Sequence, residues 1–432
     1  MNIYLKTLHF LYSQLPMFHR IGIAAYRSDL KNTKLLLDEI GNPQKNFKTI
    51  HIAGTNGKGS SSHMLAAVLQ TSGYKTGLYT SPHLKDFRER VKIDGKMIGK
   101  MYIVDWVKKH RAAMKKIKPS FFEMTVALAF NYFSDEEVDI AVIETGLGGR
   151  LDSTNVIQPV VSLITNIGLD HTEILGDTLE KIATEKAGII KRWAPIVISE
   201  THPETRQVFI DMAEQRLTEC YFADQIFQVK KIYPLLDNTT NLRLDIDKGE
   251  EPAFKHLELD LTANYQAKNI LGVLQTIEVL KEKGYEIDEN KIRTALKQVK
   301  HITGIMGRWQ TISDSPLTIC DVAHNADGIT ELLEQVAMTY HHHLHFVFGV
   351  VKDKDIAKVL SLLPKDATYY FCKADLPRAL DATELQAKAA EFNLNGNVYP
   401  SVKEALDAAQ GNAQMDDLVI VSGSTFVVAE VL

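Results

Sequence analysis

The chain has 432 residues, which is more than one ordinary hydrophobic core accommodates, so two or three domains are expected. Apolar residues make up 45% and charged residues 24% of the chain, as is usual for globular proteins that fold in water. The formal net charge of −5 at pH 7 offers no basic field to nucleic acid, so no nucleic-acid partner is expected. An anionic substrate must therefore be held by local groups.

The cysteines and the N-terminus favour a cytoplasmic protein. The three cysteines are widely spaced and fit neither a disulfide framework nor a zinc site, so reduced thiols are expected at Cys220, Cys320 and Cys372. The N-terminal segment 1–6 does not begin a basic region followed by a long apolar run, so no signal peptide is expected. No run of about 18 apolar residues predicts a membrane span.

Short apolar runs alternate with helical patterns in the first part of the chain. The expected strands are Phe47–Ala53, Tyr74–Thr80, Val138–Glu144, Val160–Thr165 and Ile196–Ser199. Helical patterns cover Ser61–Gln70 and Glu123–Phe133. Apolar strands separated by helices indicate a parallel sheet that is covered on both faces. The N-terminal region is therefore predicted to be α/β.

The next stretch, Glu200–Thr262, is polar and rich in short alternations, and it is interpreted as an antiparallel extension of the first domain. A helical pattern follows over Asn264–Lys281. The alternation of strands and helices then begins again. Strands are expected at Leu317–Asp321, Leu344–Val350, Thr368–Cys372 and Leu418–Val421, and helices at Gly328–Tyr340 and Val402–Gln410.

The predicted fold is therefore α/β with two domains. Residues 1–298 are expected to form a P-loop ATPase-like domain with a mainly parallel sheet, and residues 299–432 a smaller Rossmann-like domain. Between helix and strand in the second domain lies the histidine cluster 341–343 with His345. A solvated junction is favoured over a metal site there, because no acidic or cysteine residue is adjacent in the sequence.

The sharpest local signal is a glycine-rich loop between the strand that ends at Ala53 and the next helix. Its residues are Gly54, Thr55, Asn56, Gly57, Lys58, Gly59 and Ser60. Glycines let backbone N–H groups turn toward phosphate oxygens, and a helix N-terminus adds partial positive charge. Lys58 is suited to neutralise a β- or γ-phosphate and Ser60 to ligate Mg²⁺. A ligand-free glycine turn is the less favoured interpretation.

Three more segments follow strand-like runs and are expected at the same edge of the sheet, where parallel strands end. Ser81 follows one strand; from spacing alone, a turn or helix cap is favoured over a metal ligand. Glu144 ends another strand, where a buried carboxylate is costly unless it is paired or bound to metal. His171 follows the third and is equally compatible with a metal ligand and a structural histidine. Lys186 is in itself an ordinary surface lysine.

Together these segments resemble the folylpolyglutamate synthase/dihydrofolate synthase family of the Mur ligase superfamily. The matching segments, in chain order, are GNPQ (41–44), GTNGKGS (54–60), TSPHL (80–84), ETGLGGRLDSTN (144–155), GLDHTEILGDTLEKIATEKAGIIK (168–191), GR (307–308), DVAHN (321–325) and SGS (422–424). Each match is weak by itself, but the ordered set is specific and covers almost the whole chain.

The resemblance implies an ATP site built from both domains. Lys58 and Ser60 would hold the phosphates, with the rest of the loop around them. Asn269 would contact adenine, and Arg308 and Asp321 would bind ATP from the second domain.

The resemblance also implies two Mg²⁺ ions. Their ligands would be Ser60, Ser81, Glu144 and His171, together with Lys186, which matches a lysine that is carbamylated in the family. Carbamylation turns that lysine into an acidic metal ligand.

On the substrate side, His324 and Ser424 would lie near glutamate, and Asp152 near the pterin-bearing substrate. Lys58, Lys186 and His324 are the residues expected to take part in catalysis. Two positions depart from the family pattern: Tyr265 stands where a histidine is usual, and Val322 where a glycine is usual.

The implied activity is ATP-dependent addition of L-glutamate to dihydropteroate, to the γ-carboxylate of folate, or to both, through an acyl phosphate. The implied partners are these small molecules, without a membrane, and the chain is expected to be a monomer. Three alternatives are weaker: another Mur-type amino-acid ligase, a non-catalytic nucleotide-binding switch, and a structural or binding module. The GNPQ and ETGLGG segments speak against the first of them, and the second α/β domain and His171 against the second.

Overall fold

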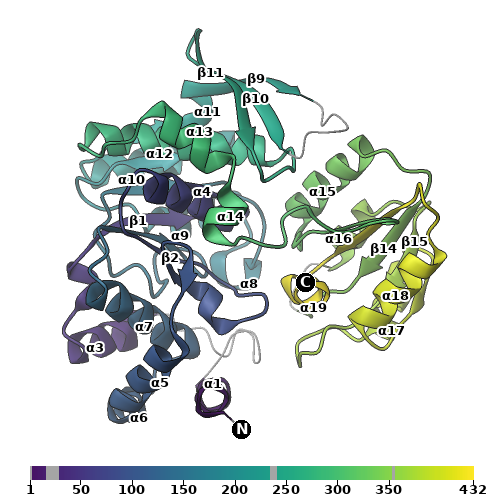
Figure 1. Cartoon of the computed structure of the whole chain (residues 1–432), viewed down its shortest axis with the longest axis horizontal. Helices are drawn as coiled ribbons and strands as arrows, with labels where there is room; N and C mark the ends of the chain where they lie inside the picture. Colours follow the sequence, from purple (N-terminus) through teal and green to yellow (C-terminus); the bar gives the residue numbers. More distant parts are fainter. Residues whose placement is uncertain (1, 16–28, 234–240, 353–355) are drawn as a thin grey trace. The chain divides into compact units, whose positions relative to one another are not determined.

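The computed structural model describes residues 2–15, 29–233, 241–352 and 356–432 (Figure 1). The chain divides into two compact units. The first contains residues 1–168 and 172–305, and the second contains residues 169–171 and 306–432. Whether 1–298 and 299–432 are the domain bounds stays a prediction.

The first unit is built around an eight-stranded sheet. In spatial order its strands are β4 (Lys96–Met97), β3 (Val91–Ile93), β2 (Thr76–Tyr79), β5 (Ile140–Glu144), β1 (Lys48–Ala53), β6 (Val161–Ile164), β7 (Ile196–Ile198) and β8 (Cys220–Phe222). Strands β2, β5, β1, β6, β7 and β8 run parallel to one another. Strands β3 and β4 are antiparallel and form one edge of the sheet. The five strands predicted in this region are confirmed.

The register of this sheet brings several strand ends to one edge. Ile52 on β1 pairs with Glu144 on β5, and Ala53 pairs with Ile164 on β6. Tyr79, at the end of β2, pairs with Ile143. The segments that follow β1, β2, β5 and β6 therefore leave the sheet side by side, as the sequence predicted for a parallel sheet.

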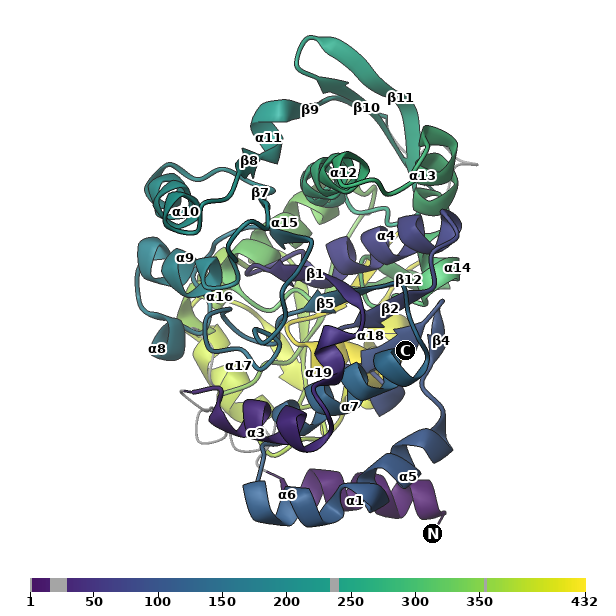
Figure 2. The same cartoon turned by 90° about the vertical axis from the view of Figure 1, so that its left-hand side faces the viewer.

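Helices cover both faces of this sheet (Figures 1 and 2). On one face lie α4 (Lys58–Thr71), α12 (Gln266–Glu282), α13 (Glu289–Leu296) and α14 (Val299–Thr303). On the other lie α1 (Ile3–Gln14), α3 (Lys31–Glu39), α5 (Lys100–Lys109), α6 (Arg111–Ile117) and α7 (Phe121–Asp135). Alternate residues of β5 enter the two cores: Ile140 and Val142 enter the first, Ala141 and Ile143 the second. This two-sided burial explains why β5 is apolar throughout.

The interpretation of Glu200–Thr262 as antiparallel structure is correct for its second half and wrong for its first. Residues Pro203–Gln215 form helix α10, and β8 adds to the main sheet in parallel. Only Thr205, Phe209 and Ala213 of α10 are buried, so its apolar stripe is too narrow to stand out in the sequence. After the short helix α11 (Ala223–Ile226) comes a separate antiparallel sheet, which consists of β9 (Phe227–Tyr233), β10 (Leu242–Lys248) and β11 (Glu251–Leu259).

The second unit contains a six-stranded sheet. In spatial order its strands are β12 (Gln310–Asp314), β13 (Leu317–Cys320), β17 (Leu418–Ser422), β14 (Leu344–Phe348), β15 (Thr368–Phe371) and β16 (Gly396–Val398). Only the β12–β13 pair is antiparallel. The helices of this unit are α15 (Ala326–Met338), α16 (Ile356–Leu362), α17 (Ala382–Ala390), α18 (Val402–Asn412) and α19 (Thr425–Val431). The predicted α/β fold, with a mainly parallel sheet followed by a smaller Rossmann-like domain, is confirmed.

The histidine cluster of this unit is only partly a solvated junction. His345 is buried, its Nδ1 lies 2.9 Å from the Tyr370 hydroxyl, and its Nε2 lies 3.3 Å from Oδ2 of Asp417. The sequence did not place Asp417 beside His345, because 72 residues separate them. Within the described residues no group of three or more histidine, cysteine, aspartate or glutamate side chains is arranged to hold a metal. No described helix is long and apolar enough to cross a membrane.

The start of α7 generates a stability prediction. The Ser120 hydroxyl accepts a hydrogen bond from the Glu123 N–H at 3.2 Å, and the Glu123 carboxylate accepts one from the Ser120 N–H at 2.6 Å, so the two residues form a buried capping box. S120A should lower the free energy of unfolding by about 1 kcal/mol in urea denaturation. K108A, at an exposed position of α5, should change it by less than about 0.5 kcal/mol. Equal effects of the two substitutions would contradict the assignment.

Candidate active site

The glycine-rich loop connects β1 to α4 and is closely packed. Gly57 has a φ of 83°, and a Cβ atom at this residue would lie 2.2 Å from Oδ1 of Asn269. A side chain at residue 57 is therefore excluded both by conformation and by contact. The same contact places Asn269, on α12, directly against the loop. The loop and Asn269, both predicted to bind ATP, lie together.

The segment after β6 braces this loop. The N–H of Thr55 donates to the Asn166 carbonyl at 3.0 Å, and the N–H of Asn56 donates to Oδ1 of Asn166 at 2.8 Å. The Thr165 hydroxyl donates to the Asn56 carbonyl. Hydrogen bonds to the segment that follows the adjacent parallel strand β6 thus fix the conformation of the loop.

Two lysine ammonium groups meet at one carbonyl of the loop. Nζ of Lys58 donates to the carbonyls of Gly54 and Thr55, at 2.9 Å in each case. Nζ of Lys186, which lies 132 residues further along the chain than Gly54, donates to the same Gly54 carbonyl at 2.8 Å. Lys186 is only 3% exposed, so the interpretation of it as an ordinary surface lysine is wrong. Its position depends on the docking of α9 (Leu179–Ala187), which no local pattern indicates.

The docking of α9 is visible in the backbone contacts of the segment that follows β5. The N–H of Arg150 donates to the Glu185 carbonyl at 2.7 Å, and the Arg150 guanidinium pairs with the Glu185 carboxylate at 2.7 Å. The amide of Asn155 donates to the Gly188 carbonyl at 3.0 Å. The segment 144–155 and the end of the segment 168–191, which were matched separately in the sequence, thus pack against each other.

Glu144 and Ser81 lie together at the ends of β5 and β2. The Ser81 N–H donates to Oε2 of Glu144 at 3.0 Å, and Glu144 is 4% exposed. The Ser60 hydroxyl accepts a hydrogen bond from the amide of Gln266 on α12 at 3.1 Å. Carboxylate and hydroxyl oxygens are ligands that suit Mg²⁺. These oxygen donors therefore fit the metal that the sequence predicts.

The Ser81 segment is held by two neighbouring residues that the sequence did not single out. Both oxygens of the Glu89 carboxylate accept backbone hydrogen bonds, from the N–H groups of residues 84, 85 and 86 at 2.7 to 2.9 Å. Arg90 is 2% exposed, and its Nε donates to Nδ1 of His83 at 2.7 Å. Burial lowers the pKa of the Arg90 guanidinium. The contact with His83, seven residues away, appears only once η3 (Phe87–Arg90) has formed.

Asp152 is bonded on both oxygens to its own loop. One oxygen accepts the N–H groups of Gly146 and Leu147, at 2.8 and 2.9 Å, and the other accepts the N–H and the hydroxyl of Thr154. Burial raises the pKa of the Asp152 carboxyl, while these hydrogen bonds act in the opposite direction. The arrangement supports a role of Asp152 in shaping the loop after β5; its predicted substrate contact stays a prediction.

The predicted residues of the second unit form their own group. The Asp321 carboxylate accepts the N–H groups of Trp309 at 2.7 Å and Ala323 at 2.9 Å, so it fixes two loops. Arg308 lies beside Trp309, and its Nη1 reaches the Gly307 carbonyl at 3.3 Å. Ser424 caps helix α19 by accepting the Phe426 N–H.

Asp170, which was not predicted, joins this second group. Its Oδ2 lies 3.5 Å from Nε2 of His324 and accepts the Asn325 amide at 3.2 Å, while Oδ1 accepts the His171 N–H. Nδ1 of His324 lies 2.8 Å from the Val322 carbonyl. The predicted metal ligand His171 belongs to the second unit, whereas Ser60, Ser81, Glu144 and Lys186 belong to the first. At 170–171 the sequence singled out only His171, and the contacts of Asp170 were missed.

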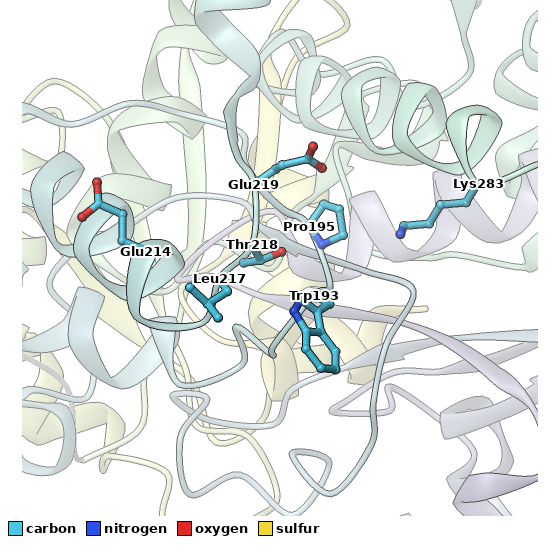
Figure 3. A pocket seen from close by; sticks show the side chains of 7 residues that line it. All are labelled: Trp193, Pro195, Glu214, Leu217, Thr218, Glu219 and Lys283. Carbon is cyan, nitrogen blue, oxygen red and sulfur yellow. The ribbon is translucent and has the colours of Figure 1, made fainter.

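A separate surface pocket contains none of the predicted site residues. It has a volume of about 620 Å³ and is lined by Trp193, Pro195, Glu214, Leu217, Thr218, Glu219 and Lys283 (Figure 3). Pro195 precedes β7 and Glu219 precedes β8, so the pocket lies at the N-terminal ends of these strands. It is therefore at the opposite edge of the sheet from the glycine-rich loop.

A buried histidine beneath the loop generates a pH prediction. Nε2 of His51, on β1, lies 2.8 Å from the Thr154 hydroxyl, which in turn donates to Asp152. Burial, and secondarily the charge of Lys191, lowers the pKa of His51 from 6.5 to about 3. Because the folded-state pKa lies below the unfolded value, the contribution of His51 to stability is complete above pH 6.5. It is lost as the pH falls toward about 3.

The H51Q variant should remove this pH dependence while it retains a donor for Thr154. Between pH 6.5 and 4.5 the wild type should lose about 2 to 3 kcal/mol more of its free energy of unfolding than H51Q. Urea denaturation at several pH values measures the difference. Parallel pH profiles of the two proteins would show that His51 is not held neutral by burial.

Comparisons with known proteins agree with this geometry. Residues 52–277 match the Mur ligase middle domain, and residues 307–425 match the Mur ligase glutamate ligase domain. The folylpolyglutamate synthase of Lacticaseibacillus casei is 33% identical over 438 residues, which cover 99% of this chain and 97% of that protein. A probable bifunctional folylpolyglutamate synthase/dihydropteroate synthase of Haloferax volcanii is 33% identical over 408 residues; this covers 93% of the chain but 47% of that protein, so the chain spans about half of it.

A solved structure is similar over the same extent. It is the crystal structure of a bifunctional folylpolyglutamate synthase/dihydrofolate synthase with Mn, AMPPNP and L-glutamate bound. The two chains are 29% identical with a TM-score of 0.83, and the match covers 99% of this chain and 97% of that chain. The chain therefore belongs to the folylpolyglutamate synthase/dihydrofolate synthase family of Mur ligases and is an ATP-dependent ligase.

Proposed function

We propose that this enzyme joins L-glutamate to dihydropteroate, to the γ-carboxylate of tetrahydrofolate, or to both, and converts ATP to ADP and phosphate. The observation that carries the proposal is the convergence of Lys58 and Lys186 on the Gly54 carbonyl. Two cations at one glycine-rich loop favour an anionic ligand, and a triphosphate supplies such charge. The relatives named as folate-glutamate ligases make the acceptor a pterin-bearing carboxylate.

In this proposal ATP occupies the glycine-rich loop. Lys58 exchanges its carbonyl partners for β- and γ-phosphate oxygens, and the first N–H groups of α4 face the phosphates. Asn269, which lies against Gly57, is positioned near adenine. Arg308 and Asp321 complete the ATP site from the second unit.

Mg²⁺ would neutralise the charge on the phosphates when bound. Its proposed ligands are Ser60, Ser81, Glu144 and His171, arranged around two ions, with Lys186 as a carbamate. Carbamylation replaces one of the two ammonium groups at Gly54 by an anion. It therefore relieves the repulsion between Lys58 and Lys186 and adds a carboxylate-like ligand to a site that is otherwise poor in acidic groups.

The reaction proceeds by two transfers. A carboxylate oxygen of the acceptor attacks the γ-phosphorus, the bond to the bridging oxygen of ADP breaks, and an acyl phosphate forms. The amine of L-glutamate, after loss of a proton, attacks the acyl carbon, and phosphate leaves as the amide forms. Lys58 stabilises charge on the transferred phosphoryl group, and the remaining work is positioning and exclusion of water.

The acceptor and the amine are assigned to the residues that remain. His324, held between the Val322 carbonyl and Asp170, is proposed to lie near the glutamate together with Ser424. Asp152 supports the pterin side, at least through the loop that it shapes. The family departure at Val322 is compatible with activity, because Val322 is not among the residues with positive φ. A glycine is therefore not required there.

The assignment is tested by phosphate release from ATP and Mg²⁺. Dihydropteroate and tetrahydrofolate are supplied separately, each with and without L-glutamate. Release that requires both glutamate and dihydropteroate establishes the synthase activity; release that requires glutamate and tetrahydrofolate establishes tail extension. K58M should lower kcat at least about 100-fold, whereas K96M, at an exposed lysine of β4, should not. If folded protein that binds ATP releases no phosphate with either pterin, the folate assignment fails, and another Mur-type ligase activity becomes the favoured assignment.

Carbamylation generates a second prediction. After equilibration with isotopically labelled CO₂, the wild type should give a carbamate carbon signal in NMR, and K186M should lack it. Removal of CO₂ should lower activity, and bicarbonate should restore it. A wild type without the signal, but with full activity in CO₂-free buffer, would contradict the carbamate and leave the ligase assignment intact. The monomeric state and the cytoplasmic location stay predictions.

A further inference from the structure

A buried lysine holds the end of helix α14. Lys92, on β3, is 5% exposed, and its Nζ donates to the carbonyl of Thr303 at 2.7 Å and to that of Gly304 at 3.2 Å. Burial lowers the pKa of Lys92. Desolvation of an ammonium group is costly, and these two carbonyls, which the helix itself leaves without a partner, offset the cost.

Two more contacts fix the same turn. Nδ1 of His63, on α4, lies 2.7 Å from the Thr303 hydroxyl, which donates to the Val299 carbonyl at 2.6 Å. A Cβ atom on Gly95, in the turn between β3 and β4, would lie 2.0 Å from the Ile302 carbonyl oxygen, so the backbones are in close contact. Helix α4, which begins at the glycine-rich loop, thus contacts the last turn of α14. The β3–β4 hairpin, which follows Ser81, contacts the same turn.

The chain passes from the first unit to the second immediately after this turn. Gly304 is held by Lys92, and the side chain of Ile305 is buried in the core of the first unit. On the other side, the N–H of Gly307 donates to the Gln310 side chain at 2.8 Å, and the Gly307 carbonyl accepts the Val322 N–H at 3.1 Å. Only Ile305 and Met306 lie between these two anchors, and the unit boundary falls between them.

We propose that Lys92 is a positioning residue, which fixes the first-unit side of the connection Ile305–Met306 and so anchors the backbone that leads to Arg308. This inference rests on the proposed function, because it takes Arg308 as an ATP ligand. Without the hydrogen bonds of Lys92 to Thr303 and Gly304, α14 frays at its end, and the backbone that leads to Arg308 loses its anchor. A small misplacement of Arg308 is enough to lower the rate strongly.

The test compares K92M, K92R and T303V with wild type. K92M has nearly the same length but cannot donate, K92R retains donors for both carbonyls, and T303V removes the hydroxyl that His63 contacts. K96M, in the same hairpin, is the matched control. For each protein we measure kcat, the Kd of a non-hydrolysable ATP analogue, the fraction folded, and hydrogen exchange of the amides in 299–304.

We expect K92M and T303V to lower kcat about tenfold or more, with the Kd of the analogue changed less than about threefold because the glycine-rich loop is intact. The amides of Ile302 and Gly304 should exchange faster. K92R should keep most of the wild-type kcat, and K96M all of it.

Three results would overturn the inference. The first is a folded K92M with kcat within about twofold of wild type. The second is a loss of activity in proportion to the unfolded fraction of the protein. That result is expected if Lys92 serves only to stabilise the fold. If K92M does not fold, T303V decides: a wild-type kcat in T303V, measured on protein whose amides in 299–304 exchange faster, shows that a loosened turn does not affect the rate and overturns the inference. Failure of the proposed function appears differently, as absence of turnover in the wild type.

Discussion

The carbonyl of Gly54 is the point on which the rest of the site depends. Gly54 directly follows β1, and its carbonyl accepts hydrogen bonds from both Lys58 and Lys186. Two ammonium groups that share one acceptor repel each other strongly in a buried setting. Anionic groups nearby offset this repulsion. That effect explains why a buried Glu144 ends the neighbouring strand β5, and why a triphosphate is the natural ligand.

The loops around this point are held by hydrogen bonds within the protein. Residues 165–166 brace the glycine-rich loop, Glu89 and Arg90 hold the segment after Ser81, and Asp152 closes the loop after β5. Such preorganisation lowers the cost of binding a polyanion and aligns it for transfer. The second unit repeats the principle, because Asp321 ties the backbone beside Arg308 to the loop that carries His324.

The sequence predicted what depends on local pattern. β1, β5 and the glycine-rich loop were found because apolar strands and a strand–loop–helix context are visible over a few residues. The sequence failed to predict features that depend on packing between residues far apart in the chain. Lys186 looks exposed until α9 docks, and Asp417 meets His345 from 72 residues away. Helix α10 was missed because its three buried residues form an apolar stripe too narrow to be recognised as a helical pattern in the sequence. For the site, the family resemblance supplied roles that spacing alone left open, notably for Ser81 and His171.

The central claim is that the carboxylate is activated as an acyl phosphate at this loop. The most direct measurement uses an acceptor whose carboxylate carries heavy oxygen, in a complete reaction with ATP and L-glutamate. The claim predicts that one labelled oxygen per turnover appears in the released phosphate, because the attacking carboxylate oxygen stays on phosphorus when the amide forms. Phosphate that contains no label, with amide formed at the normal rate, would contradict it.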